Sequence, residues 1–147
     1  MPRLIAVSRS TERTDPKTPL DAGELIAGYG LAGDAHAGLS EREISLVAIE
    51  SVEAANARYG IQAGPGSFAD NLTTEGLDVS ILQLGDRLRV GPALLEVVQL
   101  GKPRTAAHTY NYQGVSILPD VGAFCRVIEG GRVVPGDTVE VLPASNS

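Results

Sequence analysis

The sequence contains a single cysteine, Cys125, among its 147 residues. One cysteine excludes an intramolecular disulfide, and such usage is typical of a reducing compartment, so we expect a cytoplasmic protein. No apolar run approaches the roughly 18 residues that a membrane-spanning helix needs. The N-terminal stretch 1–17 lacks the apolar core and small-residue cleavage site of a secretory signal. We therefore expect neither a membrane nor a secretory pathway to be involved.

Tryptophan is absent and aromatic residues make up only 4% of the chain, so stacking platforms for nucleic-acid bases are scarce. Basic residues are also in the minority, with a formal net charge of −6. Binding to nucleic acid or to an anionic membrane surface usually requires a basic patch. The composition therefore argues against both partners, although a local basic cluster can still hold one small anion.

The chain is rich in turn formers, with 17 glycines and 9 prolines spread throughout. Short runs of apolar or alternating residues between these turns predict strands. A chain of this length fits one domain, covering residues 1–147. Many short strands in one domain predict a mainly β (α+β) fold with a few helices, arranged as a closed or partly closed barrel. The predicted strands are 3–9, 42–48, 71–77, 87–90, 93–100, 123–129 and 138–141.

One helix is well marked, because residues 49–59 are rich in helix formers and Gly60 supplies a C-terminal stop. A shorter helix is predicted within 21–30, with Asp21 as its N-cap. Asp86 and Asp137 each follow a glycine and precede an alternating run, which indicates turn residues.

The segment GDAHAGLSERE, residues 33–43, brings together three groups that can orient or protonate a substrate, Asp34, His36 and Arg42. In an extended segment, Asp34 and His36 point the same way because they are two residues apart. Their alternative role is a salt-linked loop. A zinc site is not expected, because zinc needs three or four ligands and the chain offers only two histidines and one cysteine besides its carboxylates.

Two further polar features are candidates for ligand binding. Asn71 can present its amide to a polar ligand, or it can cap a turn. The segment QLGKPRTAAH, residues 99–108, places Lys102, Arg104 and His108 on one face if it is extended, which suits an anion such as phosphate. The alternative for this segment is a solvated edge strand protected by its positive charges.

Cys125 lies in an apolar run, where alternation places it with Ala123 and Val127 and opposite Phe124. This pattern predicts a small buried core thiol rather than a reactive one.

Three segments together resemble the MOSC domain, a family named after the C-terminal domain of molybdenum cofactor sulfurases. They are GDAHAG with REISLVAIES, the long stretch PGSFADNLTTEGLDVSILQLGDRLRVGPALLEVVQLGKP, and GGRVVPGDTVEVL, so the resemblance runs from about 31 to 142. It implies a β-rich barrel with a few helices and an association with sulfur handling and with molybdenum cofactor, a phosphorylated pterin dithiolene. Pyridoxal phosphate belongs to a separate domain of the full sulfurases, so it is not expected here.

The sequence departs from the family pattern after Gly101–Lys102, where many members carry the cysteine taken to be a sulfur carrier. Arg104 stands at that place, and His108 stands where a second cysteine often follows. A guanidinium cannot act as a sulfur nucleophile. Cys125 lies beyond this cluster, so the resemblance does not make it the carrier and disfavours cysteine-dependent sulfur transfer.

The resemblance also implies a polar pocket, because Asp34, His36, Arg42 and Asn71 match polar positions of the family. The resulting hypothesis is a protein that binds molybdenum cofactor or a related anionic pterin. In this hypothesis the anion is held by Arg42, Lys102 and Arg104. The polar edges of the ligand are bound by Asn71 and Asp34. A molybdoenzyme is the possible client.

Three alternatives stay open. The first is an enzyme of another reaction type that uses His36 or His108 as acid or base with Asp34 beside them. The second is a non-catalytic interaction domain, favoured by the missing cysteines. The third is sulfur transfer through Cys125.

Overall fold

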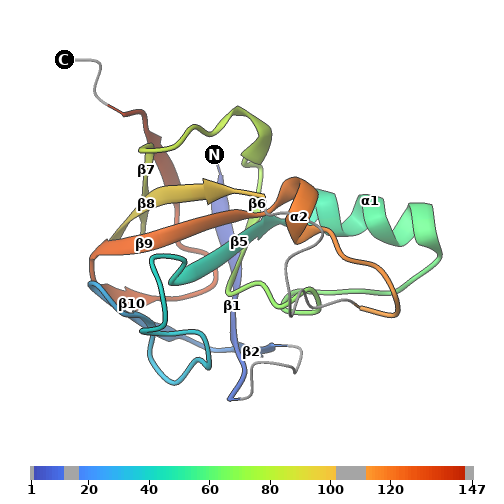
Figure 1. The fold of residues 1–147 in the computed structure, drawn as a ribbon, viewed down its shortest axis with the longest axis horizontal. Coiled ribbons are helices and arrows are strands. Elements are labelled where there is room, and N and C mark those ends of the chain that lie inside the picture. Colours follow the sequence, from blue (N-terminus) through green and yellow to red (C-terminus); the bar gives the residue numbers. More distant parts are fainter. Residues whose placement is uncertain (1, 12–16, 102–111, 145–147) are drawn as a thin grey trace.

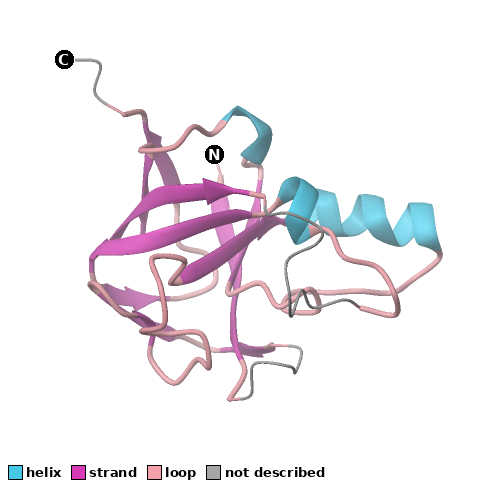
Figure 2. Ribbon diagram, in the orientation of Figure 1, coloured by secondary structure: helices cyan, strands magenta, loops and turns pink. Residues whose placement is uncertain are grey.

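The computed structural model describes residues 2–11, 17–101 and 112–144, in which β-strands predominate (Figures 1 and 2). The described strands are β1 (Arg3–Arg9), β2 (Thr18–Leu20), β3 (Gly23–Ile26), β4 (Gly30–Leu31), β5 (Ile44–Ala48), β6 (Leu72–Glu75), β7 (Arg87–Val90), β8 (Ala93–Leu100), β9 (Ala123–Glu129), β10 (Gly131–Val133) and β11 (Val139–Leu142). The helices are α1 (Ile49–Tyr59), α2 (Leu118–Val121) and the 3₁₀ turn η1 (Val79–Ile81). The prediction of a mainly β fold with a few helices is confirmed.

The strands form two sheets. The larger has eight strands in the order β11-β7-β8-β9-β5-β6-β1-β2, and the smaller has the order β10-β3-β4. All neighbouring pairs are antiparallel except β5 and β6, which run parallel. The single parallel pair marks the place where the chain crosses over through a helix.

The prediction of a closed barrel is wrong for the described residues, because no ladder joins the two ends of the large sheet. The ends approach at one isolated bridge between Arg3 and Thr138. The amide of Leu4 also donates to the carbonyl of Asp137 over 2.8 Å. Further along, the same edge of β1 pairs with β2 at residues 7–9, so a ladder with β11 cannot continue there.

The unit β5-α1-β6 is a parallel strand–helix–strand crossover, and it confirms the predicted helix over 49–59. Gly60 ends α1 in the left-handed region, with φ +66°, and its amide donates to the carbonyl of Asn56. Because α1 follows β5 directly, its first turn lies at the carboxyl end of β5. In Figure 1, α1 extends away from the sheet on the side where α2 also lies.

Apolar side chains form two clusters. One fills the interior of the curved sheet, and Cys125 belongs to it with Ala123 and Val127. The other lies between the outer face of β5 and β9 and the helices, and Phe124 belongs to it. The alternation predicted around Cys125 and its assignment as a buried core thiol are therefore confirmed.

The predicted short helix within 21–30 is wrong, because this stretch forms β3 and β4 instead. Burial alternates along β3, with Gly23 and Leu25 inside and their neighbours exposed, which is a strand period. A β-carbon on Gly23 would overlap side-chain atoms of Leu31 and Val7, so the backbone packs too closely there for a larger residue. Tertiary packing and pairing with β10 therefore override the local helix signal.

The predictions for Asp86 and Asp137 are confirmed. The carboxylate of Asp86 accepts the amide of Gln83, and the carboxylate of Asp137 accepts the amide of Val134. Both side chains thus close turns between strands.

Candidate functional site

A buried ion pair lies beside a half-exposed histidine. The ammonium of Lys17 donates to Oδ1 of Asp34 over 2.6 Å, and the two side chains are 1% and 0% exposed. The same ammonium lies 3.1 Å from Nδ1 of His36, whose side chain is 38% exposed. Lys17, Asp34 and His36 are hereafter called the lysine–aspartate–histidine cluster.

A tight turn brings Asp34 and His36 together. Gly33 adopts φ +82°, and the amide of Ala37 donates to the carbonyl of Asp34 over 3.2 Å. The amide of His36 donates to Oδ2 of Asp34, again over 3.2 Å. The two side chains therefore converge on Lys17 through a turn rather than through the extended segment considered from the sequence.

The electrostatics of the cluster favour an ionised Asp34. Burial raises the pKa of its carboxyl. The hydrogen bond and the positive charge of Lys17, with the amides of Ser10 and His36, outweigh this and hold the pKa below its usual value. A buried carboxylate with this many donors stays charged at neutral pH. Lys17 was missed from the sequence because it lies 17 residues before Asp34 and follows no local motif.

Asn71 lies at the amino end of β6 and is 1% exposed. Its Oδ1 accepts the amide of Ser45 over 3.0 Å, and its Nδ2 donates to the carbonyl of Ser8 over 3.2 Å. The side chain therefore joins β5, β6 and β1. Both ends of the amide bond to the protein in this arrangement, and a ligand-binding role for Asn71 stays a prediction.

Arg42 is exposed at a different place. Its guanidinium lies over the ring of Phe124, 5.9 Å from the centroid, on the outer face that the helices cover. Its amide donates to the hydroxyl of Ser40. The structure therefore brings Asp34 and His36 together, while the contacts of Arg42 are with another group of residues.

The other predicted site residues, Lys102, Arg104 and His108, lie outside the described residues. Gly101 directly precedes them and is described.

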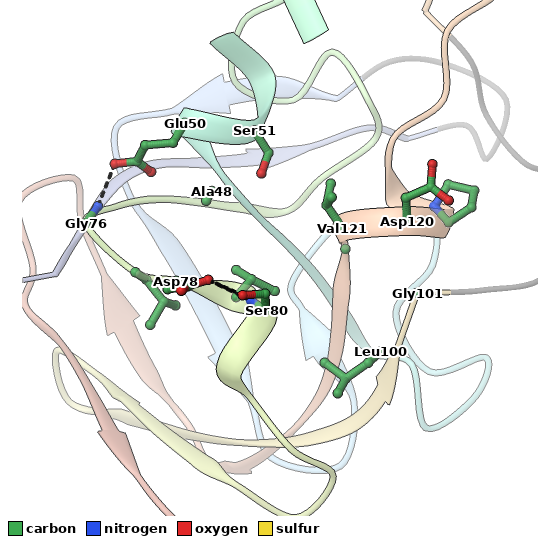
Figure 3. Close-up of a pocket in the computed structure, with 14 residues that line it drawn as sticks. Ala48, Glu50, Ser51, Gly76, Asp78, Ser80, Leu100, Gly101, Asp120 and Val121 are labelled. Atoms are coloured by element: carbon green, nitrogen blue, oxygen red, sulfur yellow. Dashed lines mark hydrogen bonds between the residues drawn. The ribbon is translucent and has the colours of Figure 1, made fainter. Parts of the chain in front are cut away.

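Gly101 lines a pocket of about 640 Å³ at the carboxyl ends of β5 and β6 (Figure 3). The pocket is lined from four directions: the start of α1, the stretch that leads into η1, the end of β8, and α2. Its apolar lining comes from Leu77, Val79, Leu100 and Val121, and its polar lining includes Glu50, Ser51, Asp78, Ser80 and Asp120.

The polar groups of this pocket have distinct roles. The carboxylate of Glu50 accepts the amide of Gly76 over 2.9 Å, and Figure 3 shows it reaching toward that residue. Asp78 accepts the amide and the hydroxyl of Ser80. Ala48 stands at the N-cap of α1 without a side-chain hydrogen bond, so among the described residues no side chain caps the first turn. That turn therefore offers backbone donors at the pocket.

The lysine–aspartate–histidine cluster lies toward the amino end of the parallel pair, because Ser10 bonds to Asp34 and, two residues earlier, Ser8 bonds to Asn71. The pocket lies at the carboxyl end. Ser45 bonds to Asn71 at the amino end, and Ala48 pairs with Thr74 at the carboxyl end. Three residues of strand separate these positions, roughly 10 Å. Of the predicted residues that the structure describes, none lines this pocket. The sequence signal that could have indicated the pocket is the direct passage from a buried strand into a helix at 48–49.

The described residues can also be compared with the residue clusters typical of metal sites and reactive thiols. No group of three or more histidine, cysteine or acidic side chains there could hold a metal ion. Cys125 is fully buried, and burial raises the pKa of its thiol to about 12. A thiol in this state is a poor nucleophile.

The helices within the described ranges are too short or too polar to cross a membrane.

Comparison with known proteins gives a consistent family match. The family model of the MOSC domain matches residues 33–140. The crystal structure of the YuaD protein from Bacillus subtilis is similar, with a TM-score of 0.75, 21% identity, and coverage of 96% of each chain.

Two structures of YiiM are similar as well. The protein from Geobacillus stearothermophilus has a TM-score of 0.74 and 21% identity over 97% of this chain and 75% of its own. The one from Escherichia coli has a TM-score of 0.66 and 25% identity over 99% of this chain and 72% of its own. At 21% identity the likeness shows the fold alone. No curated protein matches the chain.

Proposed function

Because the chain belongs to the MOSC domain family, we propose that it binds molybdenum cofactor or a related phosphorylated pterin in the pocket beside α1. The observation that carries this proposal is the pocket itself. Its volume of about 640 Å³ lies in the range of small-molecule sites, roughly 300–1,000 Å³. Its lining combines apolar side chains with a few polar groups, as such sites do.

The apolar pocket residues suit the organic ring of the cofactor, whereas the three carboxylates of the lining disfavour its phosphate, which therefore needs added positive charge. The first turn of α1 offers backbone N–H groups and the positive end of the helix dipole, which suit a phosphate. The carboxylate of Glu50 accepts a hydrogen bond from the amide of Gly76, so its negative charge faces that amide. Leu100 and Val121 offer apolar surface to a flat ring. Asp78 offers an acceptor for the amino edge of a pterin.

The pocket residues do not supply a thiolate ligand for molybdenum, because the chain's single cysteine is buried in the core. Bound cofactor would supply redox or sulfur chemistry through its own dithiolene and metal. The chain's residues would bind the phosphate, hold the ring and limit access of water. We therefore favour binding or delivery of cofactor to a molybdoenzyme client over sulfur transfer through Cys125.

We assign the additional positive charge for the anion to Lys102 and Arg104, which follow the pocket residue Gly101 in the chain. His108 lies in the same basic stretch. Arg42 is retained as a more distant contributor. Asp34 and Asn71 are not assigned to the pterin, because their side chains are engaged at the amino end of β5 and β6.

The test is analysis of the full chain purified without oxygen from its own host. Molybdenum is measured by mass spectrometry, and pterin is measured by fluorescence after oxidation. We expect both in similar molar amounts, and we expect Arg104→Ala to lower them several-fold. Arg58→Ala is the matched control, because Arg58 lies in the last turn of α1, away from the pocket.

A pocket-filling variant sharpens this test. Ser80 lines the pocket and is exposed, so Ser80→Trp should reduce occupancy without disturbing the core. Glu53→Trp, on the exposed part of α1, is its control. Equal molybdenum and pterin contents in all variants would show that any bound cofactor lies elsewhere. A protein that never carries pterin would instead favour a non-catalytic interaction domain.

A second candidate function is acid–base chemistry at His36, and the lysine–aspartate–histidine cluster is the observation that favours it. A buried ion pair next to a half-exposed imidazole is a typical arrangement for proton transfer. For any substrate that the wild type converts, His36→Gln should abolish one limb of the pH–rate profile. An unchanged profile would rule this candidate out. The same comparison with His108→Gln tests the other histidine.

A further inference from the structure

The ring of His36 lies against a group that can only donate hydrogen bonds. An ammonium carries three N–H donors and no acceptor. Nδ1 of His36 lies 3.1 Å from Nζ of Lys17, so this nitrogen must offer its lone pair to make the contact. A neutral imidazole that accepts at Nδ1 carries its proton on Nε2.

The opposite tautomer would place two donors against each other at the contact with Lys17. A proton on Nδ1 would face the ammonium of Lys17, donor against donor. Oδ2 of Asp34 is 3.8 Å from that nitrogen, which is beyond hydrogen-bond distance. The carboxylate of Asp34 accepts hydrogen bonds from the ammonium of Lys17 over 2.6 Å and from the amide of His36 over 3.2 Å. The geometry therefore selects one tautomer.

We propose that Lys17 is a positioning residue that fixes neutral His36 as the Nε2–H tautomer. In this state His36 acts through Nε2 as a neutral hydrogen-bond donor toward an oxygen of a carbonyl, carboxylate or phosphate. It does not act as a general base, because Nδ1 is occupied by the ammonium and Nε2 already carries a proton. The donor role toward a substrate rests on the second candidate function, whereas the tautomer stands independently of it.

Lys17 is suited to this role because the surrounding fold holds it in place. Its side chain is 1% exposed and its ammonium is anchored by the carboxylate of Asp34. Its backbone amide donates to the carbonyl of Gly66 over 3.0 Å. A residue fixed at both its backbone and its charged end keeps its donor directed at one nitrogen of the ring.

The experiment is a long-range proton–nitrogen NMR spectrum of the full chain labelled in its histidines. It is recorded about two pH units above the usual histidine pKa of about 6.5, so that the ring is neutral. The chain has two histidines, so a spectrum of His108→Gln assigns the signals of His36. We expect one set of His36 signals with Nε2 protonated and Nδ1 bare. A majority of the Nδ1–H form, or similar amounts of both tautomers, would overturn the proposal.

Two variants test whether Lys17 is the cause. Lys17→Arg keeps a cationic donor and should retain the Nε2–H tautomer. Lys17→Met removes the donor and should raise the fraction of the Nδ1–H form severalfold. An unchanged tautomer in folded Lys17→Met would show that another group fixes the ring. If Lys17→Met does not fold, the wild-type spectrum still decides the tautomer. A fixed tautomer in the wild type, with unchanged turnover in His36→Gln, would retain Lys17 as the positioning residue and reject the donor role toward a substrate.

Discussion

Replacing Lys17 with methionine should destabilise the protein far more than removing an exposed cation does. Methionine keeps most of the aliphatic volume, so the main change is the loss of the ammonium that faces Asp34. The Asp34 side chain is 0% exposed and would keep only the amides of Ser10 and His36 as partners. Leaving one partner of a buried ion pair uncompensated typically costs about 3–5 kcal/mol. That is a large share of the roughly 5–15 kcal/mol that stabilises a domain.

The assay is urea unfolding at pH 7, followed by circular dichroism because the chain has no tryptophan. With a denaturant slope of about 2 kcal/mol per molar, the midpoint of Lys17→Met should fall by about 2 M. Arg3→Met is the control. Arg3 pairs with Glu75, but their side chains are 56% and 46% exposed, so its loss should cost no more than about 1 kcal/mol. Equal midpoints for the two variants would refute the assignment of a buried ion pair.

The difference in stability between wild type and Lys17→Met should also depend on pH. The pKa of Asp34 is held below its ordinary value of 3.8, so its ion pair stabilises the fold above that pH. The contribution is lost as the pH falls through the lower pKa of the folded state. The difference between wild type and Lys17→Met should therefore shrink in acid. Adding Asp34→Asn to Lys17→Met should recover part of the loss at pH 7, because the unpaired charge is then removed.

Three further predictions concern other buried groups. Cys125 should resist alkylation in the folded protein and react in urea, because burial raises its pKa to about 12; rapid labelling under native conditions would revive the sulfur-transfer alternative. Asn71→Ala should lower the free energy of unfolding by about 2–4 kcal/mol, because it removes the side-chain partner of the Ser45 amide and of the Ser8 carbonyl. A loss below about 1 kcal/mol in urea unfolding would contradict this prediction. Burial raises the pKa of Asp70, so ionisation of its carboxyl lowers the free energy of unfolding as the pH rises above 3.8. Asp70→Asn should therefore gain stability relative to wild type between pH 4 and 7. A stability difference that stays constant across that range would contradict a raised pKa.

The strands and the main helix could be predicted because their signals are local. The predicted strand at 93–100 coincides with β8, that at 123–129 with β9, and the predicted helix at 49–59 with α1. The segment 21–30 failed because β3 depends on pairing with β10, more than 100 residues later in the chain. Barrel closure failed for a similar reason, since one edge of β1 is shared between β2 and the residues before β11.

The candidate site could be predicted only in part. Asp34 and His36 could be identified because they lie two residues apart in a glycine-bounded turn, and both contact the ammonium of Lys17 in the structure. Lys17, which completes that cluster, is brought in by the fold and has no sequence signal. The pocket depends on four separated segments, from Ala48 to Gly122, so no single motif could show it.

The central claim is that the pocket beside α1 binds a phosphorylated pterin. Its most direct test is a crystal structure of the full chain purified from its host without oxygen. We expect pterin between α1, η1 and α2, with its phosphate within hydrogen-bond distance of the amides in the first turn of α1. Pterin bound at the lysine–aspartate–histidine cluster instead, at the other end of β5 and β6, would contradict it.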